Sequence, residues 1–235
     1  MKYLKDGLKE WNLTLTDVQR QQFLDYTALL LSRNAQMNLT AVTEDKDIQI
    51  KHYLDSLSIV RILKPDAYCS LLDLGTGAGF PGIPIKIMYP GLRVTLADSL
   101  KKRVDFLDEV IRKLGLSGIE AVHGRAEDLA RQDTYRQRYD LCVSRAVAEL
   151  SVLSEYCLPF VRRDGYFISY KGGNAAKECE NAKKAIRLLG GEIERTVSFT
   201  LPLSEYERCL LAVGKKADTP AKYPRRAGMP AKNPL

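Results

Sequence analysis

From Cys69 onward, short apolar runs alternate with amphipathic helical segments, and this alternation limits the possible folds more than any other feature of the chain. The runs of strand length are Ser70–Leu74, Arg93–Asp98, Ile119–Gly124, Tyr139–Ser144 and Gly165–Lys171. Between them, apolar residues recur at helical spacing, as in Val104, Leu107, Ile111 and Leu114 and later in Ala182, Ile186 and Leu189. Repeated strand–helix–strand units need right-handed crossovers, which give a parallel sheet covered on both faces. The pattern predicts a doubly wound α/β fold.

The alternation stops after Gly190-Gly191. Two strand-like runs follow, Glu192–Leu201 and Glu207–Val213, separated by only five residues. So short a connection is typical of an antiparallel hairpin. The predicted sheet is therefore mostly parallel, with an antiparallel hairpin closing one edge.

The first part of the chain has a helical pattern. Thr16 and Gln19 form a capping-box signature at the start of a helix that continues through Phe23, Tyr26 and Leu30. A second helix is expected from Thr43 through Ile50, Leu54 and Leu57, with an irregular connection over Arg33–Val42. We predict a helical extension over residues 1–66, the sheet domain over 67–216 and a tail over 217–235.

The end of the chain is basic. The formal net charge is +7, and Lys215–Leu235 contains six basic residues, one acidic residue and four of the ten prolines. The rest of the chain is therefore close to neutral. This composition predicts a tail that lies extended over a surface or dangles outside the core, available as a tether for phosphates.

Other features exclude several classes of protein. Five cysteines at wide, irregular spacing, without a C-x-x-C pair, favour free thiols over a disulfide framework or a metal site. The first 13 residues lack the apolar core of a signal peptide, and no segment has the ~20 apolar residues needed to cross a bilayer. We expect a soluble cytoplasmic protein with no bound metal.

The segment Leu71–Gly82 is the most informative for function, because a buried strand ends there and turns through glycines towards a helix. Open α/β sheets bind ligands at this edge. Gly77, Gly79 and Gly82 also satisfy the dinucleotide pattern G-x-G-x-x-G. However, Asp73 would repel a pyrophosphate and suits a ligand with an ammonium group, and the hairpin is foreign to dinucleotide-binding halves. A glycine-rich turn without a ligand is the remaining alternative.

The next two strand ends carry further candidates. Asp98 follows Gly79 by 19 residues and could accept hydrogen bonds from ribose hydroxyls, although it could also be a helix N-cap. The loop after the third strand places Ala126 and Glu127 where they could flank an adenine. Both positions are compatible with a nucleoside ligand.

Four blocks then resemble one particular family: Asn38–Thr43, His52–Leu57, Asp73–Gly82 and Ser144–Ala148. With Asp98, they resemble the class I S-adenosylmethionine-dependent methyltransferases, which have a Rossmann-like doubly wound sheet. More narrowly, they look like the bacterial small-subunit ribosomal RNA guanine-N7 methyltransferases, the glucose-inhibited division protein B family. The resemblance extends from about Leu15 to the end of the chain and includes Lys222–Arg225.

The resemblance implies S-adenosylmethionine as cofactor and a guanine N7 in the five-thirty loop of 16S ribosomal RNA as target. The partner would be this RNA, the 30S subunit or its precursor, and the protein would be a monomer. The expected cofactor-binding residues are Asp73, Gly75, Gly77, Phe80, Asp98, Ser99, Leu100, Ala126, Glu127 and Arg145.

The fourth strand end is informative for what it lacks. Its residues, Ser144-Arg145-Ala146-Val147, do not form the Asn/Asp-Pro-Pro-aromatic turn of exocyclic-amine methyltransferases. Cys142 lies inside the strand and is not placed as a nucleophile for C5 methylation. A ring nitrogen such as guanine N7 has its own lone pair and no proton to remove, so it needs positioning more than a base. We therefore assign no catalytic base and take Arg145 as a candidate positioning residue.

Substrate contacts are expected from the N-terminal helices and from basic residues at the mouth of the site. The candidates are Asn38, Thr40, His52, Asp55, Ser56, Lys101, Arg103, Arg125 and Lys171. For any single one of them, a solvated surface is the alternative. Two other functions stay open: an NAD-linked oxidoreductase that uses the glycines and Asp98, and a non-catalytic ribosome- or RNA-binding module.

Overall fold

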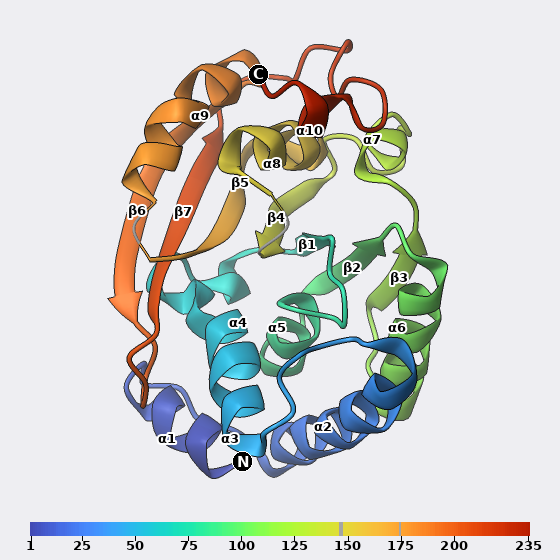
Figure 1. The fold of residues 1–235 in the computed structure, drawn as a ribbon, viewed down its shortest axis with the longest axis vertical. Coiled ribbons are helices and arrows are strands. Elements are labelled where there is room, and N and C mark those ends of the chain that lie inside the picture. Colours follow the sequence, from blue (N-terminus) through green and yellow to red (C-terminus); the bar gives the residue numbers. More distant parts are fainter. Residues whose placement is uncertain (146–147, 174) are drawn as a thin grey trace.

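The fold is built on one seven-stranded sheet (Figure 1). The computed structural model describes residues 1–145, 148–173 and 175–235. Along the sheet the strands are ordered β3-β2-β1-β4-β5-β7-β6. Their bounds are β1 Ser70–Leu74, β2 Arg93–Asp98, β3 Ile119–His123, β4 Tyr139–Arg145, β5 Val161–Gly172, β6 Gly191–Thr200 and β7 Glu207–Lys215.

Strand directions agree with the predicted topology. The first five strands pair in parallel, whereas β7 is antiparallel to both β5 and β6. All seven predicted strands are present, and the hairpin of β6 and β7 closes one edge. The sheet is therefore mostly parallel, and the predicted fold class is confirmed.

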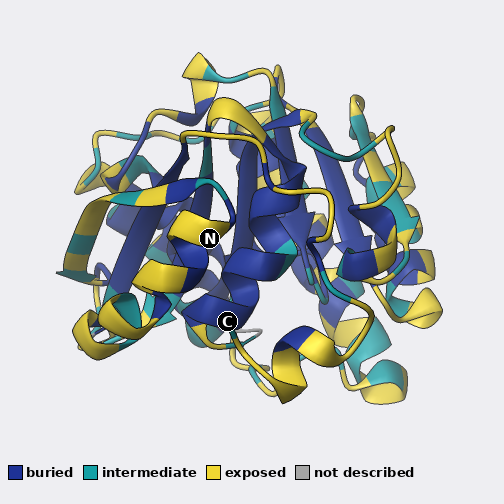
Figure 2. Ribbon diagram, turned by 90° about the horizontal axis from the view of Figure 1, so that it is seen from above, coloured by how far each residue is buried: buried dark blue, intermediate teal, exposed yellow. Residues whose placement is uncertain are grey.

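Helices cover both faces of the sheet, and alternate strand residues point into two hydrophobic cores. In β1, Leu71 belongs to the core under the N-terminal helices, whereas Leu72 belongs to the core under the C-terminal helices. Seen from above, the strands are buried between layers whose outer faces are exposed (Figure 2). The principal helices between strands are α5 Gly82–Met88, α6 Lys101–Lys113, α7 Ala126–Leu129, α8 Leu150–Cys157 and α9 Ala176–Leu188, with the 3₁₀ turn η4 Leu158–Phe160.

The N-terminal segment is helical, as predicted, but its details differ. The capping box of Thr16 and Gln19 is present at the start of α2 Asp17–Met37. The predicted irregular connection from Arg33 is wrong up to Met37, because the helix continues there and ends at Asn38 in a left-handed conformation. The helix α1 Lys2–Lys9 was not predicted. In the described part of the chain, no helix is long and apolar enough to cross a membrane.

The predicted second helix is a run of different helical turns. It consists of α3 Asp45–Asp47, the π-helix η1 Ile48–Leu54, α4 Asp55–Leu57 and the 3₁₀ turn η2 Ser58–Arg61, followed by η3 Pro65–Ala67. Almost every side chain of η1 is buried, since the segment lies between α1 and the helical layer on the sheet. The seven-residue π-helix is a notable feature, because π-helical turns occur often at functional sites.

The basic tail lies over the surface of the molecule, which was one of the two expected alternatives, but it does not stay outside the core as expected. It crosses the face that carries α8 and ends in the short helix α10 Met229–Lys232 (Figure 1). Tyr223 is buried in the core of that face, and Arg136 donates hydrogen bonds to the carbonyls of Thr219 and Tyr223. Lys215 is also buried, so it cannot reach a phosphate. The tail is part of the folded molecule.

Candidate functional site

A pocket of about 530 Å³ opens at the carboxyl ends of β1, β2 and β4. Between β1 and β4 the strand order changes direction, and open α/β sheets bind ligands at such a switch point. The volume lies within the ordinary range for small-molecule sites. Predicted cofactor residues on its wall are Gly75, Asp98, Ser99, Ala126, Glu127 and Arg145.

The glycine loop after β1 contributes Gly75 to the pocket wall and is fixed by backbone hydrogen bonds. The N–H groups of Gly75 and Thr76 donate to the carbonyl of Ala97. Gly75 and Gly77 have φ values of +72° and +61°, a region that glycine enters at little cost. Gly77 does not itself line the pocket, but its N–H donates to Asp98 Oδ2 at 3.0 Å.

Asp98 is held rigidly at the tip of β2. Its Oδ1 accepts a hydrogen bond from the N–H of Leu100 at 2.9 Å, and Arg103 lies 3.4 Å from Oδ2. The N-cap of α6 is Leu100, so Asp98 does not serve as that cap. The side chain of Leu100 is exposed and lies outside the pocket wall. Asp98 is therefore a fixed acceptor that borders the pocket.

Asp73 occupies a different position from the one predicted. It is fully buried and does not line the pocket. Its Oδ2 accepts hydrogen bonds from Thr76 Oγ1 at 2.6 Å and from the N–H of Gly82 at 2.7 Å, while Oδ1 is buried without a partner among the described residues. Burial raises the pKa of this carboxyl to about 7. Asp73 thus ties the glycine loop to α5, and its complete burial leaves no exposed surface for the predicted direct contact with a ligand.

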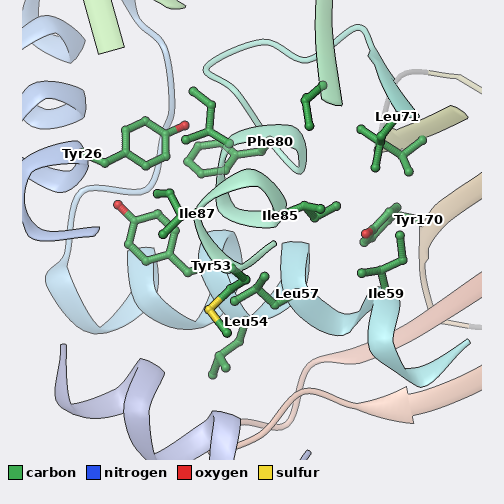
Figure 3. Packing of buried hydrophobic residues seen from close by; sticks show 14 of the residues in the cluster. Tyr26, Tyr53, Leu54, Leu57, Ile59, Leu71, Phe80, Ile85, Ile87 and Tyr170 are labelled. Atoms are coloured by element: carbon green, nitrogen blue, oxygen red, sulfur yellow. The ribbon is translucent and has the colours of Figure 1, made fainter. Parts of the chain in front are cut away.

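Phe80 also lies outside the pocket wall, so its predicted contact with the cofactor stays a prediction. It belongs to a buried aromatic cluster with Tyr26 and Tyr53 (Figure 3). His52 stacks on the Phe80 ring, with 4.4 Å between ring centroids and 19° between planes. Phe80 therefore connects the glycine loop to the N-terminal helices.

Arg145 joins the pocket to these helices. Its guanidinium lies 5.1 Å from the centroid of the Phe80 ring and donates to the carbonyl of Lys51 at 3.0 Å and to Asp55 Oδ2 at 3.1 Å. A further nitrogen lies 3.4 Å from His52 Nδ1. The predicted cofactor residue Arg145 and the predicted substrate residue His52 are therefore neighbours. Ala146 and Val147, from the same predicted block, lie outside the described residues.

His52 is buried as a neutral imidazole. Burial, together with the nearby charge of Arg145, lowers its pKa from 6.5 to about 3. Because Arg145 can only donate, Nδ1 is the acceptor and the ring proton lies on Nε2, which is 2.8 Å from Thr40 Oγ1. His52 therefore bridges the loop that follows α2 to the end of β4.

Asp55 and Ser56 are not placed to touch RNA, which corrects another prediction. Ser56 is completely buried, and its hydroxyl donates to the carbonyl of His52 at 2.6 Å. The carboxylate of Asp55 lies between Arg145 and Arg208, whose Nε donates to Oδ1 at 2.9 Å. Sequence reasoning missed Arg208, because nothing in the linear pattern relates it to a partner 153 positions away.

The remaining substrate candidates divide into two groups. Arg103 and Arg125 border the pocket, and Asn38 is exposed at the end of α2. Lys101 pairs with Asp105 on the surface of α6, whereas the ammonium of Lys171 donates to Glu178 and to the carbonyl of Ala148 in a separate depression. The structure thus brings the two arginines, but not Lys171, to the mouth of the pocket.

Seven pocket residues were not predicted as site residues. Four of them lie at or next to strand ends: Leu74, Ala97, Gly124 and Ser144. The other three are Leu153, Tyr156 and Gly228. Leu153 and Tyr156 lie on or next to the face of α8 that turns towards the sheet, and the helical pattern could have indicated them. Gly228 comes from the tail and had no signal in the sequence. Its N–H donates to Glu127 Oε1 at 2.9 Å, so the tail reaches the rim of the pocket.

Comparison with known proteins gives consistent matches. The family model described as rRNA small subunit methyltransferase G matches residues 19–207. A protein named Ribosomal RNA small subunit methyltransferase G from Alkaliphilus oremlandii is 49% identical over 232 residues, which cover 99% of this chain and 97% of that protein. A protein of the same name from Acetivibrio thermocellus is 50% identical, covering 100% of this chain and 96% of that protein.

Similar solved structures are distant in sequence. TYW2 from M. jannaschii, in complex with AdoMet, is 12% identical with a TM-score of 0.53 and covers 63% of this chain and 69% of its own. Geranyl diphosphate C-methyltransferase from Streptomyces coelicolor is 13% identical with a TM-score of 0.50 and covers 63% of this chain and 72% of its own. At such identities the likeness supports the fold alone.

Proposed function

The chain belongs to the rRNA small subunit methyltransferase G family, and from this premise we propose that it methylates N7 of one guanine in the five-thirty loop of 16S ribosomal RNA. S-adenosylmethionine is the methyl donor. The observation that carries the proposal is the pocket at the switch point, which has Asp98 and Glu127 on its wall.

The residues of the pocket fit this donor. Asp98 offers a fixed carboxylate to ribose hydroxyls beside the glycine loop, where a ligand can approach the backbone closely. Glu127, on the loop after β3, offers a carboxylate to the adenine amino group. Arg145 borders the same pocket and faces the N-terminal helices, so we place the target base between Arg145 and the donor.

Bound S-adenosylmethionine supplies an electrophilic methyl group on a positively charged sulfur. Guanine N7 attacks with an in-plane lone pair and carries no proton, so the protein has to align and desolvate the reactants. The side chains between Arg145 and the N-terminal helices fit that task. His52 is held neutral between Thr40 and Arg145, and Asp55 is shared by two arginines. These groups fix the position of Arg145, and neither His52 nor Asp55 is positioned to exchange a proton with the target guanine.

The RNA side of the proposal depends on charge at the mouth of the pocket. Arg103 and Arg125 border the opening, and Arg125 is exposed. Arginines in this position can bind phosphate oxygens and so orient the RNA without reading its sequence. We place Asn38, at the exposed end of α2, near the incoming loop. We further propose that the protein works as a cytoplasmic monomer on the 30S subunit or its precursor.

Calorimetric titration tests the donor assignment. S-adenosylhomocysteine is expected to bind the purified protein with 1:1 stoichiometry, because it keeps the nucleoside and the amino acid part of the donor. NADH is expected not to bind. Binding of NADH alone would support a dinucleotide oxidoreductase, and RNA binding without affinity for S-adenosylhomocysteine would support a non-catalytic module. Either result would contradict the proposal.

A further inference from the structure

The tail is fastened to the molecule at several points before it reaches the pocket. Arg131 donates a hydrogen bond to the carbonyl of Pro224 at 2.6 Å, and Tyr223 is buried in the core under the C-terminal helices. Beyond Tyr223, the segment Arg225–Gly228 crosses α8 and α7. The path of this segment is therefore fixed by both a core side chain and backbone hydrogen bonds.

The strongest of these attachments is at Arg225. Glu155 of α8 is almost completely buried, and its carboxylate accepts hydrogen bonds from the Arg225 backbone N–H at 2.7 Å, from Nε at 2.9 Å and from a terminal nitrogen at 2.6 Å. A buried carboxylate depends on such a partner, because ionised groups without one are costly to bury. Loss of the Arg225 side chain therefore leaves Glu155 with an uncompensated charge and favours release of the segment.

Three residues further on, the segment becomes part of the pocket. The N–H of Gly228 donates to Glu127 Oε1 at 2.9 Å, and both residues border the cavity together with Tyr156 of α8. Glu127 is itself buried, and among the described residues its second oxygen, Oε2, has no hydrogen-bonding partner. The bond from Gly228 thus holds one oxygen of the carboxylate and leaves the other available to a ligand.

We propose that Arg225–Gly228 is a component of the donor site: docking of this segment by Arg225 orients the Glu127 carboxylate towards the adenine amino group and so sets the affinity for the donor. The proposal rests on the donor assignment given above. It makes the tail a positioning element for a nucleoside ligand, in place of the phosphate tether that its charge suggested. Because coupling is reciprocal, a bound donor must also strengthen docking of the segment.

The affinity for S-adenosylhomocysteine, measured by calorimetry, provides the first test. Arg225→Ala is expected to weaken binding about tenfold, and Arg225→Lys to weaken it less, because a lysine keeps the charge opposite Glu155. In steady-state methylation, Arg225→Ala should raise the donor KM by a similar factor with little change in kcat. The analogue with hypoxanthine in place of adenine lacks the amino group. Its affinity should therefore differ much less between the wild type and Arg225→Ala than the affinity for S-adenosylhomocysteine does.

A matched control lies in the same tail. Asp218 makes a separate, exposed ion pair with Arg163 and has no contact with Glu155 or Glu127 among the described residues, so Asp218→Asn should leave the affinity for S-adenosylhomocysteine unchanged. If Arg225→Ala lowers the melting temperature but binds S-adenosylhomocysteine as the wild type does, the proposal is overturned. If the wild type does not bind S-adenosylhomocysteine at all, the donor assignment fails instead, so the two failures are distinguishable.

Limited trypsin digestion of the wild-type protein gives an independent readout. Lys222 and Arg226 are exposed, and cleavage at either site releases the end of the tail. Saturating S-adenosylhomocysteine is expected to slow this cleavage several-fold, as followed by intact mass. Cleavage at the exposed Lys113, at the end of α6, serves as the internal control. An unchanged rate at Lys222 and Arg226 in the presence of ligand would contradict the coupling.

Discussion

Asp73 and Asp98 end neighbouring strands, yet the structure uses their carboxylates differently. Asp98 borders the pocket, while Asp73 is sealed beneath the glycine loop, with Thr76 and Gly82 as donors. Both positions at the sheet edge could be predicted from strand length and the following glycines. The side of the loop on which each carboxylate lies could not be predicted, because it depends on the backbone turn after Leu74.

Gly77→Asp separates ligand binding from folding at this loop. A Cβ at Gly77 would meet no atom within 4 Å, so nothing in the protein needs to move. A new carboxylate beside Asp98 would repel the electron-rich ribose oxygens and add strain at a φ of +61°. We expect the affinity for S-adenosylhomocysteine to fall at least tenfold by calorimetry, with a fall in melting temperature of only a few degrees.

Gly115→Asp is the matched control, because Gly115 also has a φ of +61° and open space around its Cβ but lies at the far end of α6. It should show the same small loss of melting temperature and normal binding. Equal losses of affinity in the two variants would refute our placement of the loop at the donor site.

Among the elements, the π-helix η1 connects the N-terminal helices to the sheet. Periodicity predicted a helix there, and the capping box correctly predicted the start of α2. The surroundings of this segment were not predictable, because His52 contacts Thr40, Arg145 and Phe80, which no local pattern relates to it. The packing of the tail against the core was unpredictable for a similar reason. Its composition is that of a flexible segment, but Tyr223 and Arg225 have specific buried partners.

The buried His52 makes the attachment of η1 sensitive to acid. Its pKa is about 3 in the native protein and 6.5 when exposed. Between these values the unfolded chain binds a proton that the native state excludes, so stability is fully present above pH 6.5 and is lost as the pH falls. By pH 4, His52 should have removed about 3 kcal/mol from the free energy of unfolding.

Urea denaturation of wild type and His52→Gln at pH 7 and pH 4 measures this contribution. The wild type should lose more stability than the variant over this range. Asp73, whose pKa is raised to about 7, gains a proton in the native state as the pH falls from 7 to 4 and so raises the free energy of unfolding. Because Asp73 is present in both proteins, its contribution cancels in the difference between them. The exposed His123→Gln is the control. An identical pH dependence in wild type and His52→Gln would show that the imidazole is not buried as a neutral group.

At the scale of the whole molecule, three parts far apart in the sequence meet at one edge of the sheet. The loops after β1, β2 and β3 border the proposed donor pocket, the N-terminal helices approach it through Arg145, and the tail reaches its rim through Gly228. The mostly parallel sheet and its edge hairpin could be predicted from the alternation of strands and helices and from the two final strands, whereas the strand order came from the structure. That these three parts lie together could not be predicted from the sequence, since no local pattern encodes a contact between Glu127 and Gly228.

In the proposed function, this assembly delivers a methyl group to a single ring nitrogen in small-subunit RNA. The most direct measurement uses S-adenosylmethionine labelled in the methyl group, with 16S RNA and 30S subunits from a bacterium that lacks this activity. Borohydride reduction and aniline cleavage then locate N7-methylguanine. We predict label on one guanine in the five-thirty loop and one new cleavage there. Label on an adenine, a cytosine or an exocyclic amine, or no transfer to either substrate, would contradict the proposed methylation of guanine N7.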